Sequence, residues 1–340
     1  QYNPLQSTNA ARLRSSNLEN TGGTIATLGN PIQTAGMKVS RGSQPTLEGS
    51  LGLDQADRPT SVRENAIRED VAIFLSGGLL RGSGDSMPGF GAETDTDGYF
   101  FGGGIEYFPN ENSMVGISAQ YSDLDADVVL GQFAESKMLA LSLYGATKVD
   151  GFVVDGQVSI TDVDLDTVRT VSLGGNSQTL VSESSDGGLA AALGIGYDFE
   201  GTFGTISPGI EVRYVDHSLD VVEETGGILG LRVSREDFES FQGRIGLDYQ
   251  KVSGSFQVDA YADWVHEYKD GPFAVAAQFA AGNGPAVLFP VASQDKDWGE
   301  LGLSAQFGSG AFQFGLGVDT TIARKNANAQ TYRATATFKF

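Results

Sequence analysis

The chain has 340 residues, of which 19% are charged, and its formal net charge is −21 at pH 7. This acidity makes nucleic acid a poor partner, because phosphate binding depends on clustered Lys and Arg. No run of 18 apolar residues is present, so a membrane protein built from helices is excluded. A transmembrane β-barrel stays possible, because alternation of apolar and polar residues keeps its mean hydropathy near neutral. Cysteine is absent, which excludes disulfides and thiolate chemistry.

The N-terminal segment, residues 1–69, is polar and rich in Ser, Asn, Thr and Gly, so we do not expect it to form a core of its own. Residue 1 is Gln, and the sequence is expected to be a processed form or an excised piece. The last part of this segment, RPTSVRENAIRED, has capping Thr and Ser residues and predicts a short helix over 61–68. With few apolar side chains, this helix suits a polar lumen better than an apolar core.

From residue 70 onward, segments of about ten residues alternate apolar and polar side chains. In the closing TYRATATFKF, aromatic and alanine side chains share one face of a strand, while Arg, Thr and Lys side chains share the other. Twelve such segments predict twelve strands: 70–81, 98–108, 113–124, 137–148, 151–162, 188–199, 203–215, 239–250, 254–267, 298–308, 311–321 and 330–340.

The connections between these segments alternate strictly between short and long. The short ones are 109–112, 149–151, 200–202, 251–254 and 308–310, and they are rich in turn residues. The long ones are 82–97, 125–136, 163–187, 216–238, 268–297 and 322–329. A soluble sandwich has no reason to sort its loops in this way, whereas an outer-membrane barrel has short periplasmic turns and long extracellular loops. The pattern therefore predicts an all-β fold, a 12-stranded antiparallel transmembrane β-barrel.

Aromatic residues lie near the short turns, where a belt at the periplasmic membrane interface is expected. They are Tyr107, Phe108, Tyr144, Tyr197, Phe199, Tyr249, Phe307, Phe338 and Phe340.

Residues 71–340 resemble the C-terminal translocator domain of bacterial autotransporters. The resemblance rests on the twelve strands, the helix-prone linker before them, YADWVHEY in the ninth strand, GELGLSAQFGSGAFQFGLGVDT across the tenth and eleventh, and the aromatic end. It implies a Gram-negative outer membrane, insertion by the barrel-assembly machinery reading Phe338 and Phe340 as the assembly signal, and a passenger that leaves through or with the lumen. On this interpretation residues 1–69 are passenger remnant and linker, and residues 70–340 are the translocator barrel of a type V secretion protein.

Two other classes of function stay open at this point. A stand-alone outer-membrane porin or surface adhesin would use residues 1–69 as a plug or periplasmic arm. An enzyme inside the barrel is disfavoured, because nothing marks a nucleophile for either histidine, His217 or His266, and both are expected at the surface or interface. Some relatives cut their passenger at paired asparagines in the linker, where this chain has only Asn65. We therefore expect no enzymatic activity and no cofactor.

Polar residues that alternate with the apolar ones are expected to face a hydrated lumen, with the N-terminal linker as its plug. The predicted lumen-lining residues are Glu106, Asp155, Glu211, Arg213, Arg244 and Asp259. Glycines at 102, 104, 315 and 317 also face inward; they either keep clearance for a polypeptide or relieve crowding in the strands.

Acidic residues two apart in DLDAD and TDVDLD lie on one face of strands that extend above the membrane. They offer oxygen ligands for calcium, although the EF-hand spacing is missing, and solvated strand ends are the alternative. The weak calcium candidates are Asp123, Asp125, Asp127, Asp162, Asp164 and Asp166. The acidic loops are also expected to contact lipopolysaccharide through divalent ions.

Overall fold

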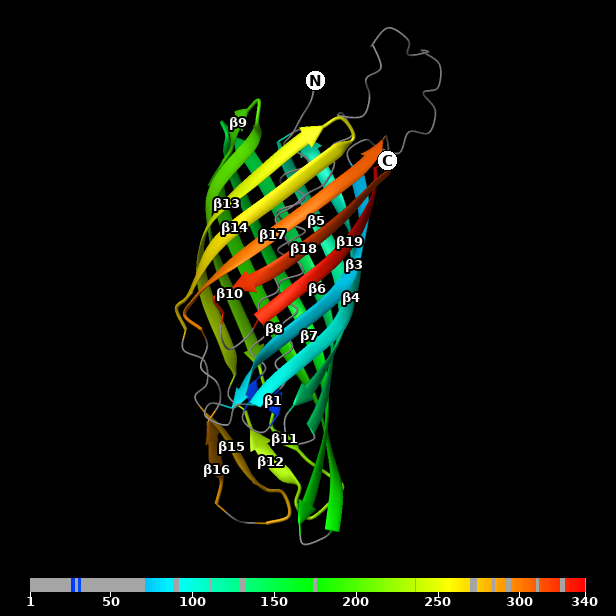
Figure 1. The fold of residues 1–340 in the computed structure, drawn as a ribbon, viewed down its shortest axis with the longest axis vertical. Coiled ribbons are helices and arrows are strands. Elements are labelled where there is room, and N and C mark those ends of the chain that lie inside the picture. The colour runs from blue at the N-terminus through cyan, green and yellow to red at the C-terminus, as the bar shows by residue number, and fades with distance from the viewer. Residues whose placement is uncertain are drawn as a thin grey trace.

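A computed structural model shows the architecture of the chain. It describes residues 26–27, 30–31, 71–87, 92–110, 112–128, 132–173, 176–235, 237–269, 274–282, 285–290, 295–309, 312–324 and 328–339. Figure 1 shows these residues as a cylinder of tilted strands with a smaller sheet at one end. Within this part of the chain, no helix is long and apolar enough to span a bilayer. The expected helix over 61–68 lies outside the described residues.

The wall of the cylinder is one closed antiparallel sheet of twelve strands, and the predicted fold class is confirmed. Consecutive strands pair with each other, and the last strand pairs with the first from Asn328–Ser83 to Lys339–Ala72, which leaves the wall without an edge. The strands are β3 (Val71–Met87), β4 (Ala92–Asn110), β5 (Ser113–Val128), β6 (Gln132–Val149), β7 (Phe152–Leu173), β8 (Asn176–Tyr197), β10 (Gly204–Ser218), β13 (Phe238–Ser253), β14 (Phe256–Glu267), β17 (Asp297–Ser309), β18 (Phe312–Ile322) and β19 (Asn328–Lys339).

Three connections expected as long loops are mostly strand. The hairpin of β7 and β8 continues to the pair Leu173–Asn176, and those of β3–β4 and β5–β6 are similarly extended. The expectation of loops over 82–97, 125–136 and 163–187 was therefore wrong. A hairpin that extends beyond the apolar part of the wall needs no apolar face, so the alternation that marks a strand in the sequence disappears there.

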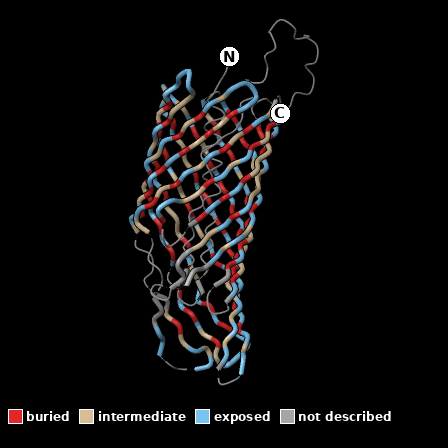
Figure 2. The backbone as a smooth tube through the Cα atoms, in the orientation of Figure 1, coloured by how far each residue is buried: buried red, intermediate tan, exposed pale blue. Residues whose placement is uncertain are grey.

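Side chains alternate between the two faces of the wall. Leu141 and Leu143 point outward and are 48% and 56% exposed, while Ser142 between them is buried. Figure 2 shows the same alternation of buried and exposed residues along the strands. An apolar outer face and a polar inner face is the pattern of a barrel that stands in lipid.

Two aromatic belts surround the outer face. At the short turns, Phe152 contacts Tyr197 at 4.9 Å between ring centroids, and Phe312 contacts Phe338 at 5.0 Å. Phe108 and Tyr144, expected in this belt, instead point inward and are buried. Alternate positions of a strand face inward, and these two residues share the inward parity of their strands, which means that they occupy such positions on β4 and β6. Near the other end, a second belt includes the ring pair Phe101–Tyr121 at 5.3 Å and the ring pair Phe241–Tyr268 at 5.6 Å.

The connections expected as loops over 216–238 and 268–297 contain a second sheet. It has four strands, β11 (Val222–Glu223), β12 (Leu231–Ser234), β15 (Ala274–Phe279) and β16 (Val287–Pro290). A bridge between Val181 and Thr225 joins it to the extended end of β8. Two further hairpins are small: β9 (Phe199–Gly201) pairs with β10, and β1 (Ala26–Thr27) pairs with β2 (Asn30–Pro31).

Candidate functional site

Charged residues on the inner face of β10, β13 and β17 form one connected group. The guanidinium of Arg213 donates to Glu211 Oε1 at 2.6 Å, and Arg244 Nη1 lies 4.0 Å from the same oxygen. Arg244 also pairs with Glu300, which lies on β17, so this ion pair crosses the intervening β14. Trp298 Nε1 donates to the second oxygen of Glu300 at 2.7 Å. Three predicted lumen residues thus meet in one network.

The other three predicted lumen residues also lie on the inner face but in separate places. Glu106 is fully buried and accepts a hydrogen bond of 3.1 Å from the hydroxyl of Tyr144. Asp259 accepts hydrogen bonds from Gln250 at 3.0 Å and from Gln257 at 2.9 Å. Asp155, which is half-buried, lies beside Gly194 on the neighbouring strand.

Sequence reasoning did not include Glu300, Trp298 or Tyr144 among the lumen residues. Parity along the strand could have found them, because Glu300 and Trp298 alternate with the outward Leu301. Tyr144 was assigned to the lipid-facing belt because it is aromatic, although its position shares inward parity with Ser142.

Inward-facing glycines make room for neighbouring side chains. A Cβ at Gly116 would lie 2.5 Å from the ring of Tyr144, and one at Gly104 would lie 2.6 Å from the ring of Phe74. Gly315 similarly borders Thr335 and Gln306. The space at these positions is thus taken by other residues of the wall, which favours relief of crowding over clearance for a polypeptide. The directly paired glycines and rings are Gly78–Phe100, Gly104–Phe74, Gly116–Tyr144, Gly188–His217 and Gly302–Tyr261.

The first strand of the barrel starts at the end that has the short turns. Val71 pairs with Tyr107, which is three residues before the end of β4 at Asn110. The chain therefore enters the wall at the short-turn end. Any segment before Val71 that reaches the long-loop end has to travel the full length of the barrel, either inside or outside it.

Ion pairs fasten the small sheet to the inner face of the extended β7–β8 hairpin. Arg169 Nε donates to Glu224 Oε1 at 2.8 Å and its Nη2 reaches the other carboxylate oxygen. Arg235 Nη2 donates to Asp186 Oδ1 at 2.8 Å. Burial lowers the pKa of the Arg235 guanidinium from its usual value, while the charge of Asp186 acts in the opposite direction.

The two histidines have different surroundings. His217 points into the barrel and is buried over Gly188, which differs from the expected surface or interfacial position. Its place follows from the inward parity that it shares with Arg213 on β10. His266 remains on the outer face, where its Nδ1 lies 2.9 Å from Asp297 Oδ1 and its ring contacts Tyr268. Neither arrangement contains a positioned nucleophile among the described residues.

Two of the six calcium candidates come together with a residue that the sequence did not indicate. Carboxylate oxygens of Asp123, Asp125 and Glu135 lie within 4.8 Å of one another on the outer face of β5 and β6. Asp162, Asp164 and Asp166 are exposed on the outer face of β7 and are not part of this group. The side chain of Asp127 lies outside the described residues. The cross-strand partner of Asp125 is Glu135, a pairing that strand register alone sets.

The predicted assembly signal is described only in part. Phe338 is exposed on the outer face of β19 and its ring lies 5.0 Å from that of Phe312. Phe340 lies outside the described residues.

Comparison with known proteins identifies relatives of the barrel. The family model described as Autotransporter beta-domain matches residues 74–320. The structure is similar to the translocator domain of autotransporter NalP from Neisseria meningitidis, with TM-score 0.65, 13% identity, and coverage of 80% of this chain and 88% of that one. It is also similar to the beta domain of the Bordetella autotransporter BrkA, with TM-score 0.55, 17% identity, and coverage of 80% and 100%.

The fold alone is shared more widely. The CymD monoaromatic hydrocarbon channel has TM-score 0.51 and 11% identity, with coverage of 81% of this chain and 89% of that one. No curated protein matches the sequence.

Proposed function

The chain belongs to the autotransporter beta-domain family, whose barrels anchor in the outer membrane and translocate a passenger, and we propose that its N-terminal segment reaches the cell surface through the lumen. The observation that carries this proposal is the direction of β3, which starts at the short-turn end. A polar segment that begins there meets either the apolar outer face or the polar inner face. Lipid excludes polar backbone, so the inner face is the favourable route.

The long-loop end is proposed to face the outside of the cell. Outer-membrane barrels have short periplasmic turns and long extracellular loops, and the extended hairpins and the small sheet are all at one end. The family consists of transport barrels rather than enzymes, which supports the proposal that this chain has no enzymatic role.

A tag experiment tests the route and the orientation together. An epitope placed before Gln1 is expected to be accessible to antibody and protease on intact cells. An epitope inserted in the β7–β8 connection, after Leu173, is the matched positive control, and one inserted at the Asp150–Gly151 turn is the periplasmic control. Protection of the N-terminal tag together with exposure of the β7–β8 tag would contradict the route while leaving the orientation intact.

Residues 1–69 are proposed to act as linker and plug. Twelve strands leave a lumen wide enough for one helix or an extended chain, intermediate between filled and open barrels. Conductance across planar bilayers should rise when residues 1–69 are removed. An unchanged conductance would contradict the plug and would favour a stand-alone pore, the rival interpretation, in which these residues form a periplasmic arm.

The inward charged residues are proposed to keep that lumen hydrated. Glu106, Asp155, Glu211, Arg213, Arg244 and Asp259 supply polar and ionic groups along a passing polypeptide.

Contacts with the cell envelope are proposed at three places. The outer face contacts outer-membrane lipid, and the acidic outer face of β5–β7 contacts lipopolysaccharide through divalent ions. The last strand contacts the barrel-assembly machinery.

The group of three carboxylates at Asp123, Asp125 and Glu135 supports the ion contact. Added calcium should raise the melting temperature, and a chelator should reverse the shift. The absence of any shift would contradict the ion site.

The assembly signal has its own test. Removal of Phe340 together with Phe338→Ala is expected to lower the amount of barrel in the outer membrane, with only a small loss of stability once folded from the lost ring contact with Phe312. Restoration of an aromatic residue at 338 alone should recover part of the yield.

A further inference from the structure

The small sheet at the long-loop end has one apolar face that crosses all four of its strands. The members of one row on this face pair directly from β11 to β12, β15 and β16, and they are Val222, Val233, Ala277 and Val287. Leu231 and Phe279 pair with each other in the next row of the same face. The other face has exposed charged residues, Glu223 and Arg232.

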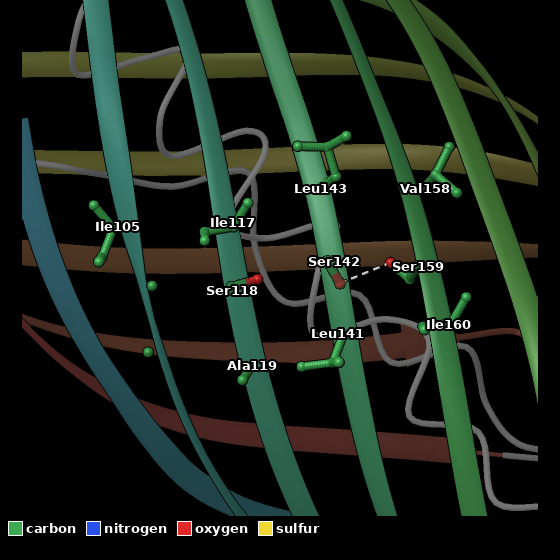
Figure 3. Close-up of a pocket in the computed structure, with 12 residues that line it drawn as sticks. Ile105, Ile117, Ser118, Ala119, Leu141, Ser142, Leu143, Val158, Ser159 and Ile160 are labelled. Atoms are coloured by element: carbon green, nitrogen blue, oxygen red, sulfur yellow. Dashed lines mark hydrogen bonds between the residues drawn. The ribbon is translucent and has the colours of Figure 1, made fainter.

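The barrel wall has the opposite arrangement, with its apolar side chains outside. Figure 3 shows the wall at β6, where Ser142 lies between Leu141 and Leu143 and makes a hydrogen bond of 2.7 Å with Ser159 on β7. The wall therefore has its apolar face towards lipid and its polar face inside.

The apolar face of the small sheet is turned inward, towards the long-loop mouth of the barrel. Glu224 has the same parity as Val222, and it binds Arg169 on the inner face of β7. Lipid is therefore not the partner of this face. An apolar surface at this place needs another apolar cover.

This face is covered at one side of the sheet and open at the other. The three residues of the row on β11, β12 and β15 are buried, whereas Val287 on β16 is 55% exposed and the neighbouring Phe279 is 52% exposed. Among the described strands, β16 pairs only with β15, which leaves its other edge open. An open strand edge is a template for a further strand.

No charged side chain protects this edge. Residues 271–294, which contain β15 and β16, form the longest run without Asp, Glu, Lys or Arg in a chain of net charge −21. Open edges in natural proteins are commonly protected by charged side chains. Pro290 ends β16, so only the part of the strand before it can take a new partner.

The N-terminal segment contains a piece that fits this edge. Its hairpin β1–β2 lies within residues 20–37, which are also uncharged. Figure 1 shows β1 near the long-loop end of the cylinder, close to the level of β11, although β3 starts at the short-turn end. The connecting residues 32–70 can extend over roughly 130 Å, whereas β3 is about 56 Å long, so the connection is long enough.

A second copy of the chain is a weaker candidate for the same edge. Two molecules that each have a net charge of −21 would have to approach each other, and like charges oppose this. A hairpin of the same chain is tethered, and a tether gives an effective concentration in the millimolar range. A short strand contact is therefore favoured within one molecule over a contact between two.

We propose that the hairpin β1–β2 adds to the open edge of β16 and holds the N-terminal segment at the long-loop end of the barrel. The joining strand is β1, because β2 contains Pro31, which cannot donate a backbone hydrogen bond. The apolar row that ends at Val287 then continues onto β1. This proposal rests on the route through the lumen proposed above, and it names the surface that retains the segment after its passage.

Paired cysteines in the full chain test the contact on intact cells. The chain has no cysteine, so Val287→Cys is combined in turn with Ile25→Cys, Ala26→Cys, Thr27→Cys and Leu28→Cys. Val221→Cys replaces Val287→Cys in the control set, because Val221 is similarly exposed but lies beside β11, at the other side of the sheet. We expect disulfides within one molecule at alternate positions of β1, at roughly ten times the yield of the control set.

Hydrogen exchange covers variants in which a cysteine disturbs the edge. Removal of residues 1–31 should raise the exchange rates of backbone amides in β16 by roughly tenfold, because their new partners are lost. The amides of β12, which has a strand on each side, should exchange as before.

Several results would overturn the proposal. They are equal disulfide yields with positions 287 and 221, equal yields at all four positions of β1, a cross-linked dimer, and unchanged exchange in β16. The epitope before Gln1 separates this proposal from the route. If that epitope is exposed on cells and the disulfides do not form, only the docking on β16 is wrong; if the epitope is protected, the route is wrong and the docking with it.

Discussion

The inner faces of strands β3 to β8 and of strands β10 to β19 are both stabilised by side-chain contacts inside the barrel, but the kinds of side chain differ. In the first half, apolar residues cluster, among them Phe74, Phe108, Met114 and Tyr144, and rings lie over glycines. In the second half, Glu211, Arg213, Arg244 and Glu300 form ion pairs within β10 and across strands. We call these the ring-packed half and the ion-paired half.

The difference indicates how a barrel of this size stabilises its wall without a close-packed hydrophobic core inside it. Adjacent strands are already joined by backbone hydrogen bonds, and side-chain contacts that skip a strand connect the wall over a longer distance. Tyr144 on β6 reaches Glu106 on β4, and Arg244 on β13 reaches Glu300 on β17. The first contact is mainly packing with one hydrogen bond, and the second depends on charge.

The largest effect is expected in the ion-paired half. Arg244→Met leaves the buried Glu300 without this guanidinium and should lower the free energy of unfolding by about 3–5 kcal/mol. Chemical unfolding in detergent or vesicles measures this. The double variant Arg244→Met with Glu300→Gln should recover much of the loss, because the charge no longer needs compensation. Arg81→Met, at the exposed pair with Asp97, is the control that should change little. A loss of the same size in the control would contradict the assignment to burial.

A smaller effect is expected in the ring-packed half. Gly116→Val places side-chain atoms against the ring of Tyr144 and should cost about 1–3 kcal/mol through overpacking. Tyr144→Ala in the same chain should relieve the clash, so the two changes should not add. Gly187→Ala, where a Cβ meets nothing within 4 Å, serves as the control. Simple additivity of the two changes in a double-mutant cycle would show that the ring and the glycine do not interact.

An effect confined to the long-loop end is expected outside both halves. Glu224→Gln weakens the charged hydrogen bonds from Arg169 and should increase proteolytic cleavage within 219–237 by roughly tenfold, because the small sheet opens more often. The melting of the barrel itself should barely change. Limited proteolysis and thermal melting of the same sample separate the two. A large loss of barrel stability would contradict the separation of the sheet from the wall.

The smallest effect concerns ion flow through the lumen. Buried inward carboxylates, including Asp248, Asp259, Asp263 and Asp319, outnumber the arginines near them in the described wall, so a barrel without residues 1–69 should prefer cations. Asp259→Asn should reduce that preference by a small amount, measured as a shift of reversal potential in a salt gradient. An anion preference in the parent barrel would contradict this interpretation of the ion-paired half.

Much of the wall could be predicted from the sequence. Period-two alternation located every barrel strand, and the order of short and long connections distinguished a barrel from a sandwich. Both signals arise because the wall has lipid on one side and water on the other, so both can be read from the residues of the chain. Where water is on both sides, as beyond Ile160 on β7, the signal ends although the strand continues to Leu173.

The candidate site was predicted less completely. The side of the wall on which a residue lies follows from parity, which placed Glu211, Arg213 and Arg244 on one face of their strands. The partners that skip a strand do not follow from parity, because they depend on the tilt and stagger of the barrel. The ion pair of Arg244 with Glu300 therefore required coordinates. The contact of Asp125 with Glu135 joins neighbouring strands and required the register of that pair. The aromatic character of Tyr144 suggested lipid, whereas its partner Gly116 made room for it inside.

Alternation of lipid contact along the last strand is the most direct test of the account. The chain has no cysteine, so single substitutions Ala334→Cys, Thr335→Cys and Ala336→Cys can each carry one fluorescent label in the barrel reconstituted into vesicles. Lipids with brominated acyl chains should quench the label strongly at 334 and 336 and weakly at 335, because β19 turns successive side chains to opposite faces. Equal quenching at all three positions, or none at any, would contradict a closed barrel that meets lipid outside and water within.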